Sequence, residues 1–206
     1  MMRLYRAPYS TNVERVALAL AHKGLEVQSV WIEYDDRSPV ERVSGQPLVP
    51  VLEFEDGAVV ADSMQIVRVV EERFPQSPLY PADAAGRARM IRFIDWFNDV
   101  WKVAPNAIAA EIGRDRPDLV RIDELAAQMQ AALDRFEGML DGRSHLVGDA
   151  FSAADCAAYP FLKYALGRDP ADDELFHRVL DGYQQLGDDH PRLAAWIERI
   201  DERPRV

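Results

Sequence analysis

Ser10 is the first residue whose type and position could do chemistry. It stands just before an apolar repeat of helical spacing that ends near Gly24, and Arg15 follows it by five positions. A hydroxyl there can donate to a bound anion, and a helix N-terminus adds positive potential. Such surroundings suit a thiolate, because they lower a thiol pKa from about 8.5 toward neutrality. Capping of the helix by Ser10 or Thr11 explains the same residues without a ligand.

Two further positions could take up a ligand through backbone groups. Val49-Pro50 precedes a strand, and Pro50 belongs at the strand's first residue because it cannot donate a ladder hydrogen bond. The residues alone favour a trans bond, since only about 5–6% of X-Pro bonds are cis. Asp62-Ser63 opens a later helix, whose N-terminus could hold an anion. Helix capping again explains Asp62 and Ser63 with no ligand.

The elements that must position these residues follow an α/β order in the first half of the chain. A strand at Leu4-Tyr5, a helix ending before Gly24 and a strand over 27–32 predict a parallel pair with a right-handed crossover. A hairpin with the two-residue turn Asp56-Gly57 and an amphipathic helix over 64–74 come next.

The second half of the chain reads as all helical. Three prolines in the segment 75–81 predict a stiff linker. Beyond it, Pro105 should kink or break the first long helix. Ser152 and Asp155 form a capping box that serves folding. The expected helices span 83–112, 118–140, 152–166, 175–186 and 192–200.

Composition excludes several function classes. The net charge of the 206 residues is −11, which argues against nucleic acid and anionic membranes as partners. No apolar run approaches the ~20 residues of a membrane helix, and no signal peptide is evident at the N-terminus, so we expect a cytoplasmic protein. Cys156 is the one cysteine, and the four histidines show no ligand spacing, so we expect neither a disulfide nor a metal.

The motifs together resemble the cytosolic glutathione transferases over nearly the full length. Tyr9 to Val16 is similar to the serine-type members of the phi, theta and zeta classes, closest to phi. The resemblance implies a thioredoxin-like N-terminal domain (1–76), a linker (77–84) and an all-α C-terminal domain (85–206). It also implies attack of glutathione thiolate on an electrophilic small molecule, with Ser10 stabilising the thiolate, in a homodimer.

The resemblance assigns roles to individual residues. A cis Val49-Pro50 bond would turn the backbone of Val49 toward the cysteinyl part of glutathione. Asp62 would hold the γ-glutamyl amine, and Ser63 its carboxylate. Relatives often carry Lys or Gln where Leu48 stands, and here Gln46 is the candidate to replace it. Tyr9, Trp101 and Asn106 are expected in the electrophile pocket, although core packing also explains Trp101 and its aromatic neighbours.

Other functions remain open on the residues alone. Pro47 and Leu48 favour a binding or stress protein of the same fold with little turnover, whereas Ser10 and Asp62-Ser63 favour catalysis. Peroxide reduction or isomerisation would use the same activated thiolate. Thiol-disulfide exchange or dehydroascorbate reduction would require a cysteine at the position of Ser10, so both are disfavoured.

Overall fold

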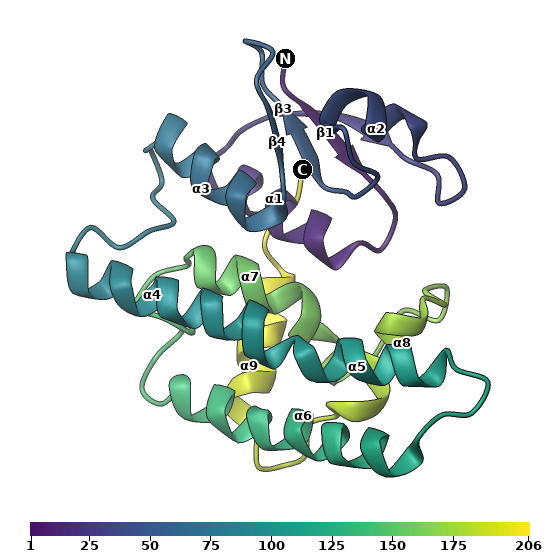
Figure 1. Cartoon of the computed structure of the whole chain (residues 1–206). Coiled ribbons are helices and arrows are strands. Elements are labelled where there is room, and N and C mark those ends of the chain that lie inside the picture. The colour runs from purple at the N-terminus through teal and green to yellow at the C-terminus, as the bar shows by residue number, and fades with distance from the viewer. The chain divides into compact units, whose positions relative to one another are not determined.

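The computed structural model describes all 206 residues, which form two compact units (Figure 1). The first unit comprises residues 1–80 together with 203–206, and the second comprises 81–202. The expected division instead ended the first domain at residue 76 and assigned the C-terminus to the second. The difference arises from contacts of the linker and of the last four residues, which are described below.

The first unit is built on a four-stranded sheet. Its strands are β1 (Arg3–Arg6), β2 (Gln28–Trp31), β3 (Val51–Glu53) and β4 (Val59–Ala61), in the order β2-β1-β3-β4. The pair β1-β2 is parallel, as predicted, and the other two pairs are antiparallel. The helices are α1 (Thr11–His22), α2 (Ser38–Ser44) and α3 (Ser63–Arg73). The predicted order of elements is therefore confirmed.

Alternation along the strands gives the sheet two buried faces. Leu4 and Leu52 are paired across β1 and β3, and neither is exposed to solvent. The neighbouring pair, Tyr5 and Val51, packs with Val40 of α2 on the other face. Successive strand residues point to opposite faces, so helices cover both sides of this short sheet.

The hairpin between β3 and β4 differs from its prediction. The amide of Phe54 donates to the carbonyl of Ala58 (2.8 Å), which encloses three residues rather than two. Gly57 has φ +83°, a left-handed conformation that a residue without Cβ adopts freely. Asp56-Gly57 marked the turn correctly, but a left-handed glycine also closes three-residue hairpin loops.

A buried ammonium fixes the linker to the first unit. The Nζ of Lys23, at the end of α1, lies 2.6 Å from a carboxylate oxygen of Glu71 on α3. It also donates to the carbonyls of Phe74 (2.8 Å) and Gln76 (3.1 Å). Glu71 in turn accepts from the amide of Leu79 (3.0 Å). These contacts explain why the first unit extends to residue 80.

The C-terminal residues 203–206 also belong to the first unit. The guanidinium of Arg6 donates to the carbonyl of Val206 (2.7 Å), and Arg205 pairs with Glu14 (3.1 Å). Arg203 donates to Nδ1 of His22 (2.9 Å), which must therefore be unprotonated there. The tail thus contacts β1 and α1.

The second unit is helical, as predicted. The stretch expected as one helix over 83–112 is interrupted by a π-helical turn just before Pro105, so the predicted break is confirmed. Pro105 itself lies in the first turn of the helix that follows, where its missing N–H needs no partner. No helix of the chain is long and apolar enough to cross a membrane. The elements are α4 (Ala84–Trp96), η1 (Phe97–Trp101), α5 (Val103–Ile112), α6 (Leu119–Met139), α7 (Ala153–Leu162), η2 (Lys163–Leu166), α8 (Leu175–Tyr183) and α9 (Pro191–Asp201).

The predicted capping box is present at the start of α7. Asp155 is fully buried and accepts from the amide of Ser152 (2.9 Å). Its carboxylate also accepts from the amide of Leu146 (3.1 Å) and from Nε1 of Trp196 in α9 (2.9 Å). The box therefore joins α7 to α9 and to the loop after α6, beyond its local role.

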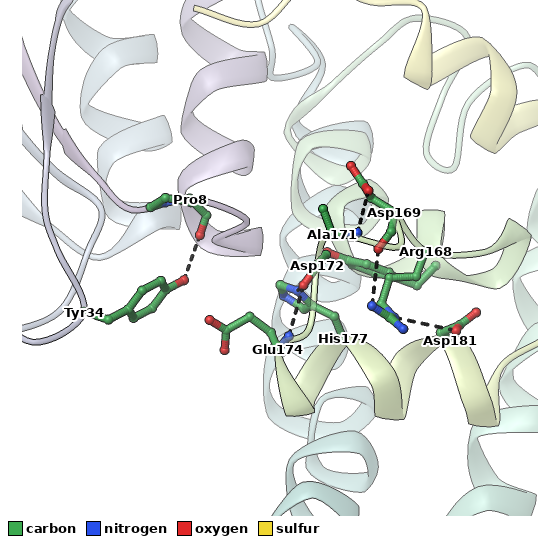
Figure 2. A network of polar contacts seen from close by, with 10 residues as sticks. Pro8, Tyr34, Arg168, Asp169, Ala171, Asp172, Glu174, His177 and Asp181 are labelled. Atoms are coloured by element: carbon green, nitrogen blue, oxygen red, sulfur yellow. Dashed lines mark hydrogen bonds and ion pairs between the residues drawn. The ribbon is translucent and has the colours of Figure 1, made fainter.

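A second buried carboxylate organises the chain around α8 (Figure 2). Asp172 accepts from Nδ1 of His177 (2.8 Å) and from the hydroxyl of Tyr164 (3.0 Å). The rings of His177 and Tyr164 are stacked, with centroids 4.7 Å apart. The network attaches the first turn of α8 to η2.

Candidate functional site

Sheet register determines where the candidate residues of the first unit lie. Tyr5 of β1 pairs with Val51 of β3, and Val51 pairs with Ala61 of β4. The chain after β1, the chain before β3 and the chain after β4 therefore emerge at one end of the sheet. Those three segments carry Ser10, Val49-Pro50 and Asp62-Ser63, so the fold gathers residues that are distant in sequence.

Ser10 is the N-cap residue of α1. Its Oγ accepts a hydrogen bond from the amide of Val13 (3.3 Å), which is the capping role that the sequence also allowed. The hydroxyl proton is not needed for this bond, so Ser10 can cap the helix and still donate to an anion. The loop before it is held by the hydroxyl of Tyr34, which donates to the carbonyl of Pro8 (2.7 Å; Figure 2).

The loop before β3 is ordered by its own side chains. The Val49-Pro50 bond is cis, as the resemblance implies. The Nε2 of Gln46 donates to the carbonyl of Leu48 (2.9 Å) and its Oε1 accepts from the amide of Leu48 (2.7 Å). The backbone of Val49 makes no hydrogen bond within the chain, so its N–H and C=O are available to a ligand.

Asp62 has a strained backbone conformation, and only one of its two carboxylate oxygens is hydrogen-bonded within the chain. It is the N-cap residue of α3 with φ +72°, which is uncommon for a residue with a side chain and costs roughly 1–3 kcal/mol. Its Oδ1 accepts from the amides of Met64 (3.0 Å) and Gln65 (2.9 Å). The other oxygen, Oδ2, has no partner within the chain and can accept from a ligand amine.

Arg15 is a site residue whose role the sequence analysis missed. It is 2% exposed, and its guanidinium donates to Oγ of Ser63 (3.3 Å), which is itself 3% exposed. The bond joins α1 to the first residue of α3 and leaves the hydroxyl proton of Ser63 able to donate. An arginine among the apolar residues Val13, Val16 and Ala17 is the signal that could have indicated a buried role.

The charges around this end of the sheet favour an anion. The N-termini of α1 and α3 each carry partial positive charge, and Arg15 adds a full charge beneath α3. No group of three or more His, Cys, Asp or Glu side chains is arranged so that it could hold a metal ion.

The expected pocket residues lie in different surroundings. Tyr9 is 44% exposed, with φ +55°, in the first unit. Trp101 is 5% exposed and stacks on Phe97 (centroids 4.5 Å apart) in the aromatic core of the second unit, which supports the core-packing alternative. Its Nε1 is buried without a partner. Asn106 is exposed on α5.

Comparison with known proteins identifies the two halves of the chain. Residues 4–78 match the glutathione S-transferase N-terminal domain, and residues 120–199 match the glutathione S-transferase C-terminal domain. Glutathione S-transferase GstB of Escherichia coli strain K12 is 26% identical, over 100% of this chain and 96% of the relative. A probable glutathione S-transferase of rice, Oryza sativa subsp. japonica, is 25% identical, over 100% of this chain and 93% of the relative.

A solved structure extends the likeness to the fold. The crystal structure of a glutathione S-transferase from Methylobacillus flagellatus, with glutathione bound, superposes with a TM-score of 0.78. The two sequences are 25% identical, and the match covers 100% of both chains. With matching family domains in both halves and full-length relatives, the chain belongs to the cytosolic glutathione transferase family.

Proposed function

We propose that the protein is a glutathione transferase that conjugates glutathione to an electrophilic small molecule. The observation that carries the proposal is the sheet register, which gathers Ser10, Val49 and Asp62-Ser63 at one end of the sheet beside the N-termini of two helices. Arg15 adds a buried cation there. Such an arrangement suits an anionic, peptide-like thiol.

Ser10 stabilises the thiolate. Its Oγ accepts from the amide of Val13, so the hydroxyl proton is directed away from the helix and toward the bound sulfur. A lower thiol pKa raises the thiolate fraction, which is the attacking species. The sulfur forms a bond to the electrophilic carbon, and the electron pair of the broken bond leaves with the displaced group. Ser10 stays a hydrogen-bond donor throughout.

The other residues hold the tripeptide. The N–H and C=O of Val49 pair with the cysteinyl backbone in the manner of an added strand. The free Oδ2 of Asp62 accepts from the γ-glutamyl amine, and the N-terminus of α3 with Ser63 binds the α-carboxylate. Gln46 acts as a positioning residue, since both ends of its amide are bonded to Leu48.

Variants at Ser10 separate catalysis from capping. Calorimetry should detect glutathione binding in the millimolar range or tighter, with similar affinity in Ser10→Ala. The Ala variant should lose conjugation of a generic electrophile by at least about tenfold at neutral pH, as expected for a thiol pKa raised by one unit or more. Ser10→Thr keeps both the cap acceptor and the donor and should retain most activity. Ser10→Asp keeps only the cap and should be as inactive as Ala.

The same variants can refute the proposal. If several millimolar glutathione gives no heat with the wild type, the chain does not use this thiol. If Ser10→Asp is as active as Ser10→Thr, or if Ser10→Ala loses binding and conjugation equally, Ser10 is only a cap.

A second function is favoured by the loop before β3. Leu48 is 71% exposed and offers no polar group, and Gln46 is occupied by its own loop. A protein of this fold that binds glutathione with little turnover would have these features. Glutathione-dependent peroxide reduction or isomerisation would use the same thiolate, and a panel of electrophiles, peroxides and isomerisable substrates separates these reactions.

The assembly and location follow from the same proposal. We expect a homodimer that acts in the cytoplasm on a hydrophobic electrophile, with Tyr9, Trp101 and Asn106 as candidate pocket residues. Sedimentation velocity would test the dimer, because a single monomeric species at micromolar concentration would contradict it. Substitution of Tyr9 should change the Michaelis constant for the electrophile more than that for glutathione.

A further inference from the structure

The C-terminal residues 203–206 bring a cation to the helix that begins after Ser10. The guanidinium of Arg205 donates from Nη2 (3.1 Å) and from Nε (3.3 Å) to one carboxylate oxygen of Glu14. Less than a quarter of either side chain is exposed to solvent. Glu14 lies in the first turn of α1, and its amide donates to the carbonyl of Ser10 (3.0 Å). The ion pair therefore lies one helical turn from the residue proposed to stabilise the thiolate.

Arg205 is fixed in this position by the rest of the tail. Its Nη1 donates to the carbonyl of Arg203 (2.6 Å), and Arg203 itself donates to Nδ1 of His22 (2.9 Å). The next residue, Val206, accepts at its carbonyl from Arg6 of β1 (2.7 Å). Because the residues on both sides of it are anchored to the first unit, Arg205 keeps its guanidinium against Glu14.

The charge of Glu14 opposes a thiolate at the start of α1. Side chains one helical turn apart have Cβ atoms about 6 Å apart, so this carboxylate lies roughly 10 Å from a sulfur that accepts from Ser10. At that distance one unit charge shifts a pKa by about 0.3 units in water and by about 1.2 units at an effective dielectric constant of about 20. Glu14 without a cation would thus raise the pKa of the bound thiol.

The other charged groups near the starts of α1 and α3 are engaged elsewhere. Arg15 of α1 donates to Oγ of Ser63, and Oδ1 of Asp62 accepts from the first amides of α3. Arg6 of β1 contacts the tail, and His22 lies at the opposite end of α1. Arg205 is therefore the cation in position to offset the charge of Glu14.

From these contacts we propose that Arg205 is a positioning residue for glutathione conjugation, which offsets Glu14 and so keeps the start of α1 positive enough to hold the sulfur as a thiolate. The inference rests on the proposed function and extends its machinery to the end of the chain. Arg205 acts through Glu14 and does not contact the sulfur, so it should affect thiol ionisation rather than binding of the tripeptide.

Titration of bound glutathione by thiolate absorbance tests the proposal on the full-length protein. Arg205→Gln should raise the pKa of the bound thiol by roughly 0.3 to 1.2 units and slow conjugation of 1-chloro-2,4-dinitrobenzene about two- to fifteenfold below that pKa. The two rates should converge at high pH, where the thiol is ionised in both proteins. Affinity for glutathione should change by less than about twofold, and Arg205→Lys, which keeps the charge, should titrate close to the wild type.

Glu14→Gln separates this electrostatic role from a structural one. It breaks the same ion pair as Arg205→Gln but leaves a cation rather than an anion, so it should lower the pKa of the bound thiol. The double variant Glu14→Gln/Arg205→Gln removes both charges and should titrate close to the wild type. The matched control is Arg73→Gln, which breaks the ion pair with Asp56 (2.8 Å) at the far end of α3 and should leave the thiol pKa unchanged.

These measurements distinguish failure of the inference from failure of the proposed function. If the wild type lowers the pKa of bound glutathione and Arg205→Gln does so equally, Arg205 has no such role and the proposed function stands. If Glu14→Gln raises the pKa as Arg205→Gln does, the ion pair only stabilises the fold, and an equal rise in Arg73→Gln would likewise overturn the inference. A wild type that leaves the thiol at its free pKa overturns both.

Discussion

Replacing Asp155 should destabilise the second unit far more than an average substitution does. The carboxylate is fully buried and accepts four hydrogen bonds, from the amides of Leu146 and Ser152, the hydroxyl of Ser152 and the indole of Trp196. An unsatisfied buried donor costs about 1–3 kcal/mol, and these costs are not additive where water can enter. We therefore expect Asp155→Ala to lose about 3–5 kcal/mol of unfolding free energy.

Asp155→Asn provides an intermediate case. The amide keeps one oxygen acceptor but turns an NH₂ group toward either the Ser152 donors or the Leu146 and Trp196 donors. About half of the hydrogen bonds survive, so the loss should be roughly 2–3 kcal/mol. Asp189→Ala, at an exposed aspartate without a partner, is the control and should change stability by less than about 0.5 kcal/mol.

Urea denaturation, followed by circular dichroism and by tryptophan fluorescence, measures these losses. A single two-state fit is adequate only if the two signals coincide, because the chain has two units. A loss below about 1 kcal/mol in Asp155→Ala would refute the reasoning, since the four donors would then be satisfied without the carboxylate.

Three further outcomes follow from the first unit. Burial, with Arg203 and Lys23, lowers the pKa of His22 below 6.5, so the unfolded chain takes up the proton first as the pH falls. The contribution of His22 to the free energy of unfolding should thus be full above about pH 6.5 and decline below it. His22→Gln should reduce this decline, measured as the urea midpoint between about pH 7.5 and 5.5. A midpoint that falls with pH as steeply as in the wild type would contradict the assignment. Lys23→Met leaves Glu71 without its cation and should lower the free energy of unfolding by about 3 kcal/mol. It should also speed proteolysis within residues 74–80, because Lys23 no longer bonds their carbonyls. Cleavage at the wild-type rate would show that Lys23 does not hold the linker. Gln46→Ala removes both hydrogen bonds to the backbone of Leu48 and should weaken glutathione binding about three- to tenfold with kcat nearly unchanged. A loss confined to kcat would argue against a positioning role for Gln46.

Most of the fold could be predicted from local patterns. Alternating apolar residues, the Asp56-Gly57 turn and the capping residues Ser10 and Asp62 each reflect interactions between residues close in sequence. The hairpin loop length was wrong because left-handed glycine serves both two- and three-residue loops. The break in the long helix near Pro105 could be predicted because a proline cannot donate to the turn that precedes it, and α5 begins two residues before the proline.

The parts that could not be predicted depend on long-range contacts. The hydrogen bond from Arg15 to Ser63 spans 48 positions. The contacts of Lys23 with Glu71 and with the linker carbonyls likewise join residues that no local pattern relates. The attachment of residues 203–206 to α1 and β1 required the folded chain. The candidate site could be named residue by residue through its resemblance to a family, but the shared role of Asp62, with one oxygen capping and one free, needed the structure.

The central claim is that the start of α1 keeps a bound sulfur anionic, and titration of that sulfur tests it most directly. The ultraviolet absorbance of thiolate is recorded against pH for glutathione bound to the wild type and to Ser10→Ala. The account predicts a bound thiol pKa at least about one unit below the ~8.5 of a free thiol in the wild type, and a return toward 8.5 in Ser10→Ala. A wild-type complex that titrates like free glutathione, or a Ser10→Ala complex that titrates like the wild type, would contradict it.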